Sequence, residues 1–162
     1  MRAFVALCLA VASLLAALFA ATAVTATAGA SARERAVVRA INFQRSVNGV
    51  RHVRRAGGLA RAAGHHSREM LAWDFFSHNS LDGTAFSTRI RRFARFRSVG
   101  ETIAWMTGCR RAARRTLRMW MNSPPHRGVI LSGRYRRVGV GVARGSFGGR
   151  RACMVTADFG RR

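Results

Sequence analysis

Two segments near the C-terminus, RRVGVGVARG at 136–145 and RACMVTADFG at 151–160, determine the class of fold. A glycine-rich turn joins them, so together they predict an antiparallel β-hairpin. Alternate valines of the first strand share one face, whereas Gly139 and Gly141 leave the opposite face bare. Glycine inside a strand indicates close approach of another backbone or of a ligand. The bare face therefore predicts either a tightly packed helix or a ligand.

The segments that precede this hairpin alternate between helical and strand patterns. Residues 51–57 look like a basic connector, and SHNSLDGT at 77–84 has the composition of a loop. Together with the hairpin, these segments predict an α+β domain in which helices cover an antiparallel sheet. The predicted helices cover 33–49, 59–75, 85–93 and 110–121, and one further strand covers 98–106.

Both prolines of the chain lie side by side in WMNSPPHRGVI at 120–130, directly before His126. Proline breaks a helix interior but suits the first helical turn. We therefore expect Pro124-Pro125 to end the preceding helix and to begin a short new one. The fixed backbone would then present His126 at a defined angle; the alternative is an ordinary helix break beside an exposed histidine.

The first thirty residues differ in composition from the rest. Arg2 is followed by an uncharged run rich in Ala and Leu, and small residues follow at 26–30. This pattern predicts a secretory signal peptide at 1–30, with an uncleaved membrane anchor as the alternative. The remaining domain would span 33–162 and function extracellularly or at the cell envelope.

The charge of the chain is strongly positive. Its 162 residues include 29 basic ones, all arginine, against six acidic ones, for a formal net charge of +23. GC-rich codon usage explains part of this bias, so the count alone does not define a function. Export argues against nucleic acid as the natural partner and favours anionic wall polymers or lipid headgroups as partners of the arginines.

Export also changes the interpretation of the cysteines. Cys8 belongs to the signal peptide, which leaves Cys109 and Cys153. Two cysteines in an exported domain predict one disulfide, with two buried thiols as the alternative. Neither has a nearby partner at the spacing of a zinc site.

Five further motifs occur together in a recognisable order. They are FFSH at 75–78 followed by SLDGT, GETIAW at 100–105, WMNSPPHR at 120–127, GRYRRVGVGVA at 133–143 and TADFG at 156–160. In this order and spacing they closely resemble the CAP superfamily of extracellular SCP-like domains, and most of all its short bacterial members. The resemblance implies an α-β-α sandwich with a three-stranded antiparallel sheet.

The resemblance also implies a cleft with a divalent cation, often zinc. Its matching residues are His78 in FFSH, His126 in SPPHR and Glu101 in GETIA. His78 and His126 are the expected metal ligands. Glu101 is expected as a third ligand, as a group that orients a histidine, or as a general base.

The chain departs from the family pattern in three ways. Thr102 replaces an amide, Val129 replaces a polar residue, and no acidic residue lies between Glu101 and Asp158. The familiar tetrad of two histidines and two glutamates is thus reduced to a triad. No serine lies in a G-x-S-x-G context, so an enzyme is not the favoured interpretation, and no catalytic residue is established.

Three other histidines are interpreted as structural or surface residues. His66 lies on the apolar stripe of the helix at 59–75 and is expected in the core, with Glu69 one turn away; His65 and His52 are expected on the surface. The favoured function is therefore a monomeric, secreted binding module whose cleft takes a small or lipid-like ligand. The alternatives are a metal-dependent hydrolase using the same cleft and an arginine-rich protein that binds anionic surfaces.

Overall fold

The structure, a computed structural model, describes residues 32–162, and the predicted signal peptide at 1–30 lies outside these residues. Residues 32–47 are helical. Arg33–Arg162 form one compact unit, and none of the described helices is long and apolar enough to cross a membrane. The following elements are β1 (Arg54–Arg55), α2 (Gly57–Ala72), α3 (Phe86–Phe93), β2 (Ser98–Thr107), α4 (Ala112–Met121), α5 (Pro124–Leu131), β3 (Arg137–Phe147) and β4 (Arg150–Arg161).

The described strands form one sheet in the order β1-β3-β4-β2. β4 pairs antiparallel with both β3 and β2, which confirms the hairpin and the strand predicted at 98–106. The prediction of three strands was one short, because β1 lies in the predicted connector and runs parallel to β3. The Arg54 N–H donates to the Arg136 carbonyl at 3.0 Å. A strand of two exposed residues has no apolar alternation, so periodicity could not reveal it.

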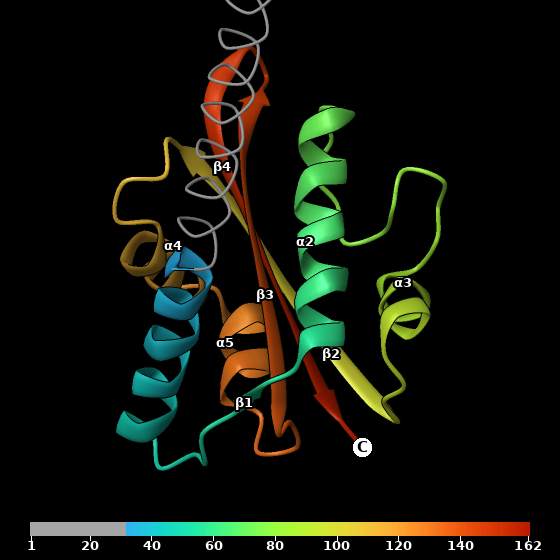
Figure 1. Cartoon of the computed structure of the whole chain (residues 1–162). Coiled ribbons are helices and arrows are strands. Elements are labelled where there is room, and N and C mark those ends of the chain that lie inside the picture. Colours follow the sequence, from blue (N-terminus) through green and yellow to red (C-terminus); the bar gives the residue numbers. More distant parts are fainter. Residues whose placement is uncertain (1–31) are drawn as a thin grey trace, which may run out of the picture. The chain divides into compact units, whose positions relative to one another are not determined.

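Helices cover both faces of this sheet (Figure 1). The helix at 32–47, α4 and α5 lie on one face and form the main core cluster with the apolar side chains of β3 and β4. Helices α2 and α3 lie on the other face, where two smaller clusters join them to β2 and β4. This arrangement confirms the predicted α-β-α sandwich.

The bare face of β3 is covered by a helix. A Cβ atom added to Gly139 would lie 2.0 Å from the Ala60 backbone nitrogen, and one added to Gly141 would lie 2.3 Å from that of Gly64. Of the two alternatives left by the sequence, the structure therefore selects backbone packing against α2. Only glycine fits at these two positions, which allows the backbone of α2 to lie directly against β3.

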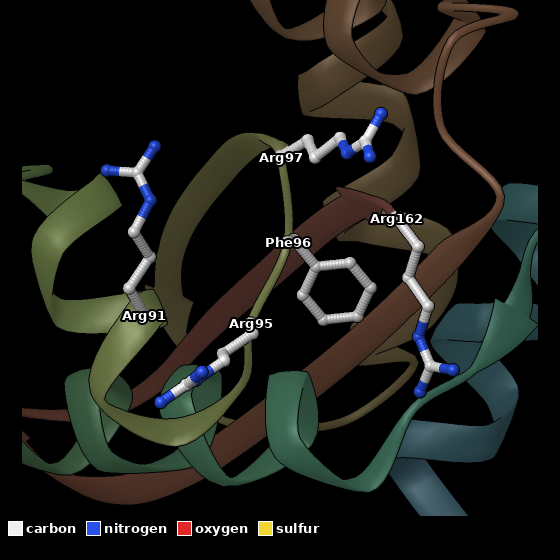
Figure 2. Close-up of a pocket in the computed structure, with 5 residues that line it drawn as sticks. All are labelled: Arg91, Arg95, Phe96, Arg97 and Arg162. Atoms are coloured by element: carbon white, nitrogen blue, oxygen red, sulfur yellow. The ribbon is translucent and has the colours of Figure 1, made fainter.

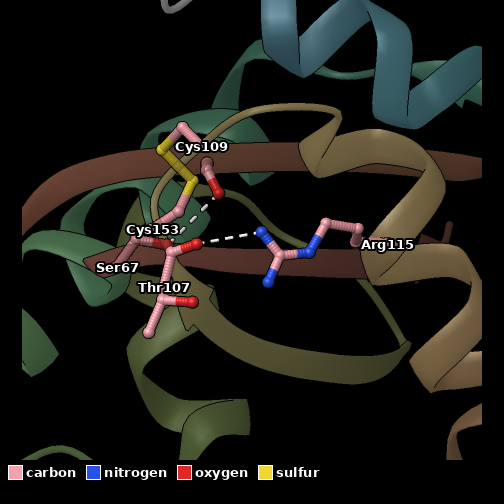
Figure 3. Close-up of a disulfide and its surroundings, with 6 residues drawn as sticks. Ser67, Thr107, Cys109, Arg115 and Cys153 are labelled. Atoms are coloured by element: carbon pink, nitrogen blue, oxygen red, sulfur yellow. Dashed lines mark hydrogen bonds between the residues drawn. A yellow bond between two sulfur atoms is a disulfide. The ribbon is translucent and has the colours of Figure 1, made fainter. Parts of the chain in front are cut away.

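The two ends of the sheet differ in their side chains. Where β2 begins and β4 ends, the Arg97 N–H donates to the Arg161 carbonyl at 2.9 Å, and several arginine side chains surround Phe96 (Figure 2). At the opposite end, a disulfide joins Cys109, just after β2, to Cys153 in β4 (Figure 3).

This disulfide confirms the predicted bridge and excludes two free thiols. The two Cα atoms are 5.0 Å apart, and the residues are separated by 44 positions in the sequence. A loop of this length is worth about 4 kcal/mol in the chain-entropy account. Next to it, Arg115 Nη1 donates to the Thr107 carbonyl at 2.9 Å (Figure 3), so the region after β2 is fixed both covalently and by hydrogen bonding.

Candidate functional site

His78 lies in the loop between α2 and α3 and is held from two sides. Its Nδ1 donates to Glu101 Oε1 at 2.8 Å, and its carbonyl accepts from Arg89 Nη1 at 2.8 Å. The imidazole remains 45 % exposed, and its Nε2 has no hydrogen-bond partner in the part of the chain that the structure describes. The loop therefore presents one free ring nitrogen of His78 to a ligand.

Glu101 is the buried centre of the site. It lies in β2 with a fully buried side chain, and Arg89 Nη2 from α3 forms an ion pair with its second carboxylate oxygen. Both oxygens of Glu101 are thus engaged, one by His78 and one by Arg89. A buried ion pair with this many partners acts mainly to fix geometry.

Pro124 and Pro125, which begin the helix that carries His126, place this histidine near His78. Helix α5 begins at Pro124 as predicted, with both prolines in its first turn and Ser123 at the N-cap. The rings of His126 and His78 lie 6.1 Å apart between centroids, and His126 Nδ1 lies 3.0 Å from Ser123 Oγ. Burial, followed by the nearby His78, holds the pKa of His126 below its usual value. His126 is therefore a neutral imidazole at neutral pH.

A second carboxyl group, from Asp158, joins the site. Asp158 is fully buried in β4 and directly opposite Glu101 in the strand register. Burial raises the pKa of Asp158 well above its usual value, and Glu101 raises it further, while Arg89 opposes the shift. Burial therefore favours the protonated form of Asp158, and neither of its oxygens has a hydrogen-bond partner within residues 32–162.

Sequence reasoning missed both Arg89 and Asp158. Nothing in the composition distinguishes Arg89 from the other arginines, and only the packing of α3 against β2 shows that it is buried. Asp158 was noted as the next acidic residue after Glu101, but its proximity depends on the register of β2 against β4. That register was the one signal that could have linked the two carboxyl groups.

The residues present do not form the metal site that the resemblance implies. Within residues 32–162, no group of three or more His, Cys, Asp or Glu side chains is placed to hold a metal ion. Both Glu101 oxygens are engaged, and the positive charge of Arg89 opposes a second cation there. Catalytic zinc usually needs three protein ligands, and His78 and His126 supply two.

The remaining histidines do not belong to the His78–Glu101–His126 group. His66 is fully buried; its Nδ1 lies 3.0 Å from Glu69 Oε2, and its Nε2 donates to the Ser77 carbonyl at 2.8 Å. His66 is thus the core histidine that was predicted, and it anchors the loop that carries His78. His65 and His52 are exposed, as expected.

Two of the three departures from the family pattern, Thr102 and Val129, lie in or against the core. Thr102 is fully buried on the face of β2 away from Glu101, and its hydroxyl has no partner among the described residues. Val129 packs against the main core cluster. The structure thus gives both residues a packing role outside the His78–Glu101 contact.

With this geometry in place, comparison with known proteins identifies the family. Residues 38–159 match the model of CAP, the cysteine-rich secretory protein family. This chain belongs to the CAP family. It is 28% identical over 121 residues to the protein YkwD of Bacillus subtilis (strain 168), an alignment that covers 74% of this chain and 46% of YkwD. The chain thus spans about half the length of this relative.

Solved structures share the CAP fold. An extracellular protein with an SCP domain from Bacillus anthracis has a TM-score of 0.70 at 24% identity, covering 82% of this chain and 41% of that one. An outer surface protein of Borrelia burgdorferi has a TM-score of 0.68 at 19% identity, covering 80% of this chain and 92% of that one. At these identities, the similarity establishes the fold alone.

Proposed function

We propose that this CAP domain is an extracellular binding module whose cleft takes a small, lipid-like ligand with a polar head. The observation that carries the proposal is the pair of imidazole rings, His78 and His126, which face each other at 6.1 Å. His78 is fixed by Glu101, so it presents its free nitrogen with little entropy left to lose on binding.

The chemistry of the cleft supports a ligand with both polar and apolar parts. Ser123 Oγ lies 3.0 Å from Nδ1 of the neutral His126, so Nε2 is the ring nitrogen left for a carboxyl or hydroxyl head group. The Phe86 ring lies 6.2 Å from the His78 ring and supplies an apolar surface beside it. Binding sites for small molecules typically combine apolar walls with a few placed polar groups of this kind.

The extracellular location rests on the signal-like sequence at 1–30 and on the printed descriptions of two similar structures. One is called an extracellular protein and the other an outer surface protein. The disulfide between Cys109 and Cys153 supports the same location, because such bonds persist in oxidising compartments.

A hydrolase is less well supported by the same cleft. Ser123 Oγ does lie 3.0 Å from His126 Nδ1, which brings a hydroxyl to an imidazole. However, within residues 32–162 no carboxylate bonds to His126 to orient it as a base, because Glu101 bonds to His78 instead. A nucleophile without an oriented base is weakly activated.

The test uses dodecanoate as a probe in isothermal calorimetry with the purified protein. We expect saturable binding that the double variant His78→Ala/His126→Ala loses and that the exposed control His65→Ala retains. Parallel incubation with the p-nitrophenyl ester of dodecanoic acid should show no turnover above the double variant. Equal dodecanoate binding by wild type and double variant would refute the proposed cleft, and turnover that depends on His126 would favour the hydrolase.

A further inference from the structure

A second surface, which includes neither His78 nor His126, has a strongly basic composition. Two adjoining hollows of about 770 and 570 Å³ lie at the end of the sheet where β2 begins. They share Arg95, Phe96 and Arg162. The first adds Arg91 and Arg97, and the second adds Arg55, Arg61 and Arg137. We call these side chains together the arginine hollow.

The fold brings these arginines together from separate elements. Arg91 lies in α3, Arg95 and Arg97 follow that helix, and Arg162 follows β4. Figure 2 shows the side chains of these four arginines placed around the Phe96 ring. Phe96 itself is 8 % exposed and packs with Leu59 and Ile90, so it is an anchor in the core that sets the position of its arginine neighbours.

Positive charge strongly dominates the lining of the arginine hollow. None of the six acidic residues of the chain lines it. Within residues 32–162, the guanidinium groups of Arg91, Arg95, Arg97 and Arg162 make no hydrogen bond or ion pair, whereas Glu34 lies near Arg55. Closely spaced like charges destabilise a fold through mutual repulsion, and a bound anion would relieve that cost.

We propose that the arginine hollow binds a flexible polymer of phosphodiesters. The planar guanidinium group forms paired hydrogen bonds with phosphate oxygens, and several such groups in one hollow suit a ligand with successive phosphates. The first turn of α2 opens onto the same hollow at Gly57 and Gly58, with no side-chain cap, and adds to the positive potential.

The lining argues against two other polyanions. Single-stranded nucleic acid binds by stacking bases on exposed aromatic rings, but of the two rings that line the hollow Phe96 is buried and Phe93 is only partly exposed. A membrane surface would engage exposed apolar side chains as well as arginines. The large exposed apolar residues of the described chain lie elsewhere, at Phe43, Val47, Trp73, Phe76, Leu81 and Met119. A phosphate chain without bases or acyl tails fits the hollow best.

The test compares two variants with the same loss of charge. The hollow variant is Arg91→Gln/Arg95→Gln/Arg162→Gln, and the control is Arg110→Gln/Arg114→Gln/Arg118→Gln, which changes three exposed arginines in and before α4. Binding of a synthetic poly(glycerol phosphate) is measured by fluorescence anisotropy from 50 to 200 mM salt. We expect the hollow variant to bind about tenfold more weakly and the control to bind within about twofold of wild type.

The salt dependence gives a second readout. The slope of log K against log salt should decrease by roughly two for the hollow variant and by little for the control. An equal loss in both variants, or no binding by the wild type, would overturn the proposal, because net charge alone would then account for any attraction. The proposal would also be overturned if the hollow variant lost more affinity for phosphatidylglycerol vesicles, or for a single-stranded oligonucleotide, than for the polymer. The dodecanoate result does not bear on this outcome, because the histidines are unchanged.

Discussion

Among the residues that the structure describes, two pairs of histidine and carboxylate have nearly equal spacing and opposite burial. In the first pair, His66 is fully buried and Glu69 is 14 % exposed, with 3.0 Å between them. In the second pair, His78 is 45 % exposed and Glu101 is fully buried, with 2.8 Å between them. The carboxylate is the more exposed partner in the first pair, and the histidine is the more exposed partner in the second.

This reversal separates a structural histidine from one available to a ligand. Both ring nitrogens of His66 face oxygen acceptors within the protein, so no position remains for a ligand. His78 uses one nitrogen on Glu101, which Arg89 fixes in turn, and leaves the other free. The burial of the carboxylate, not the presence of the pair, is what makes a histidine available and still well oriented.

The largest expected effect comes from breaking the buried ion pair. Glu101→Gln removes the carboxylate that pairs with the buried Arg89 guanidinium, which should lower the free energy of unfolding by about 3–5 kcal/mol. Glu69→Gln, at the partly exposed carboxylate, should cost about 1 kcal/mol. Urea denaturation monitored by circular dichroism measures both. Equal losses of unfolding free energy in the two variants would show that burial of the carboxylate does not change its contribution to stability.

The two regions should also respond to pH with opposite signs. Because burial raises the folded-state pKa of Asp158, the native state keeps a proton that the unfolded chain releases above about pH 4. The wild type should therefore lose stability relative to Asp158→Asn as pH rises, by at most about 1.4 kcal/mol per pH unit. The measurement is the free energy of unfolding of both proteins from pH 4 to pH 7.

Glu69 supplies the matching control. Burial would raise its pKa, but hydrogen bonds from His66, Leu81 and Ser80 outweigh burial and hold the pKa below its usual value. The contribution of ionised Glu69 to the free energy of unfolding is thus present above about pH 4.5. It is lost as pH falls through the lower folded-state pKa of Glu69. The difference between wild type and Glu69→Gln should shrink toward low pH. If the Asp158 and Glu69 variants changed in stability with pH in the same direction, the opposite pKa shifts of these two residues would be contradicted.

The two histidines should also differ in what they contribute to stability. His66→Ala removes a buried ring and leaves the Ser77 carbonyl unpaired, which should cost about 2–3 kcal/mol. His78→Ala should cost less than about 1 kcal/mol, because its ring is half exposed. Thermal unfolding measures both, with His65→Ala as the exposed neighbour that changes little. A larger loss for His78→Ala would reverse the roles given to the two residues.

Much of the fold could be predicted because its signals are local. The alternating valines of β3 predicted a strand, the glycines between them predicted close approach of a helix or of a ligand, and Pro124-Pro125 predicted the start of α5. These features depend on residues next to each other in the chain, whose backbone preferences act over a few positions. By contrast, β1 rests on two backbone bonds to a distant segment, so its own residues carry no such signal.

The sequence by itself determined the layered fold, the disulfide between Cys109 and Cys153 and the positions of His78, Glu101 and His126 in recognisable motifs. Only the tertiary structure decided that Arg89 is buried against Glu101, that Asp158 lies beside them, and that distant arginines line one hollow. The physical reason is the separation along the chain over which each effect acts. Strand and helix preferences arise between neighbours, whereas burial, counter-charge and protonation depend on which remote segments the packed layers bring together.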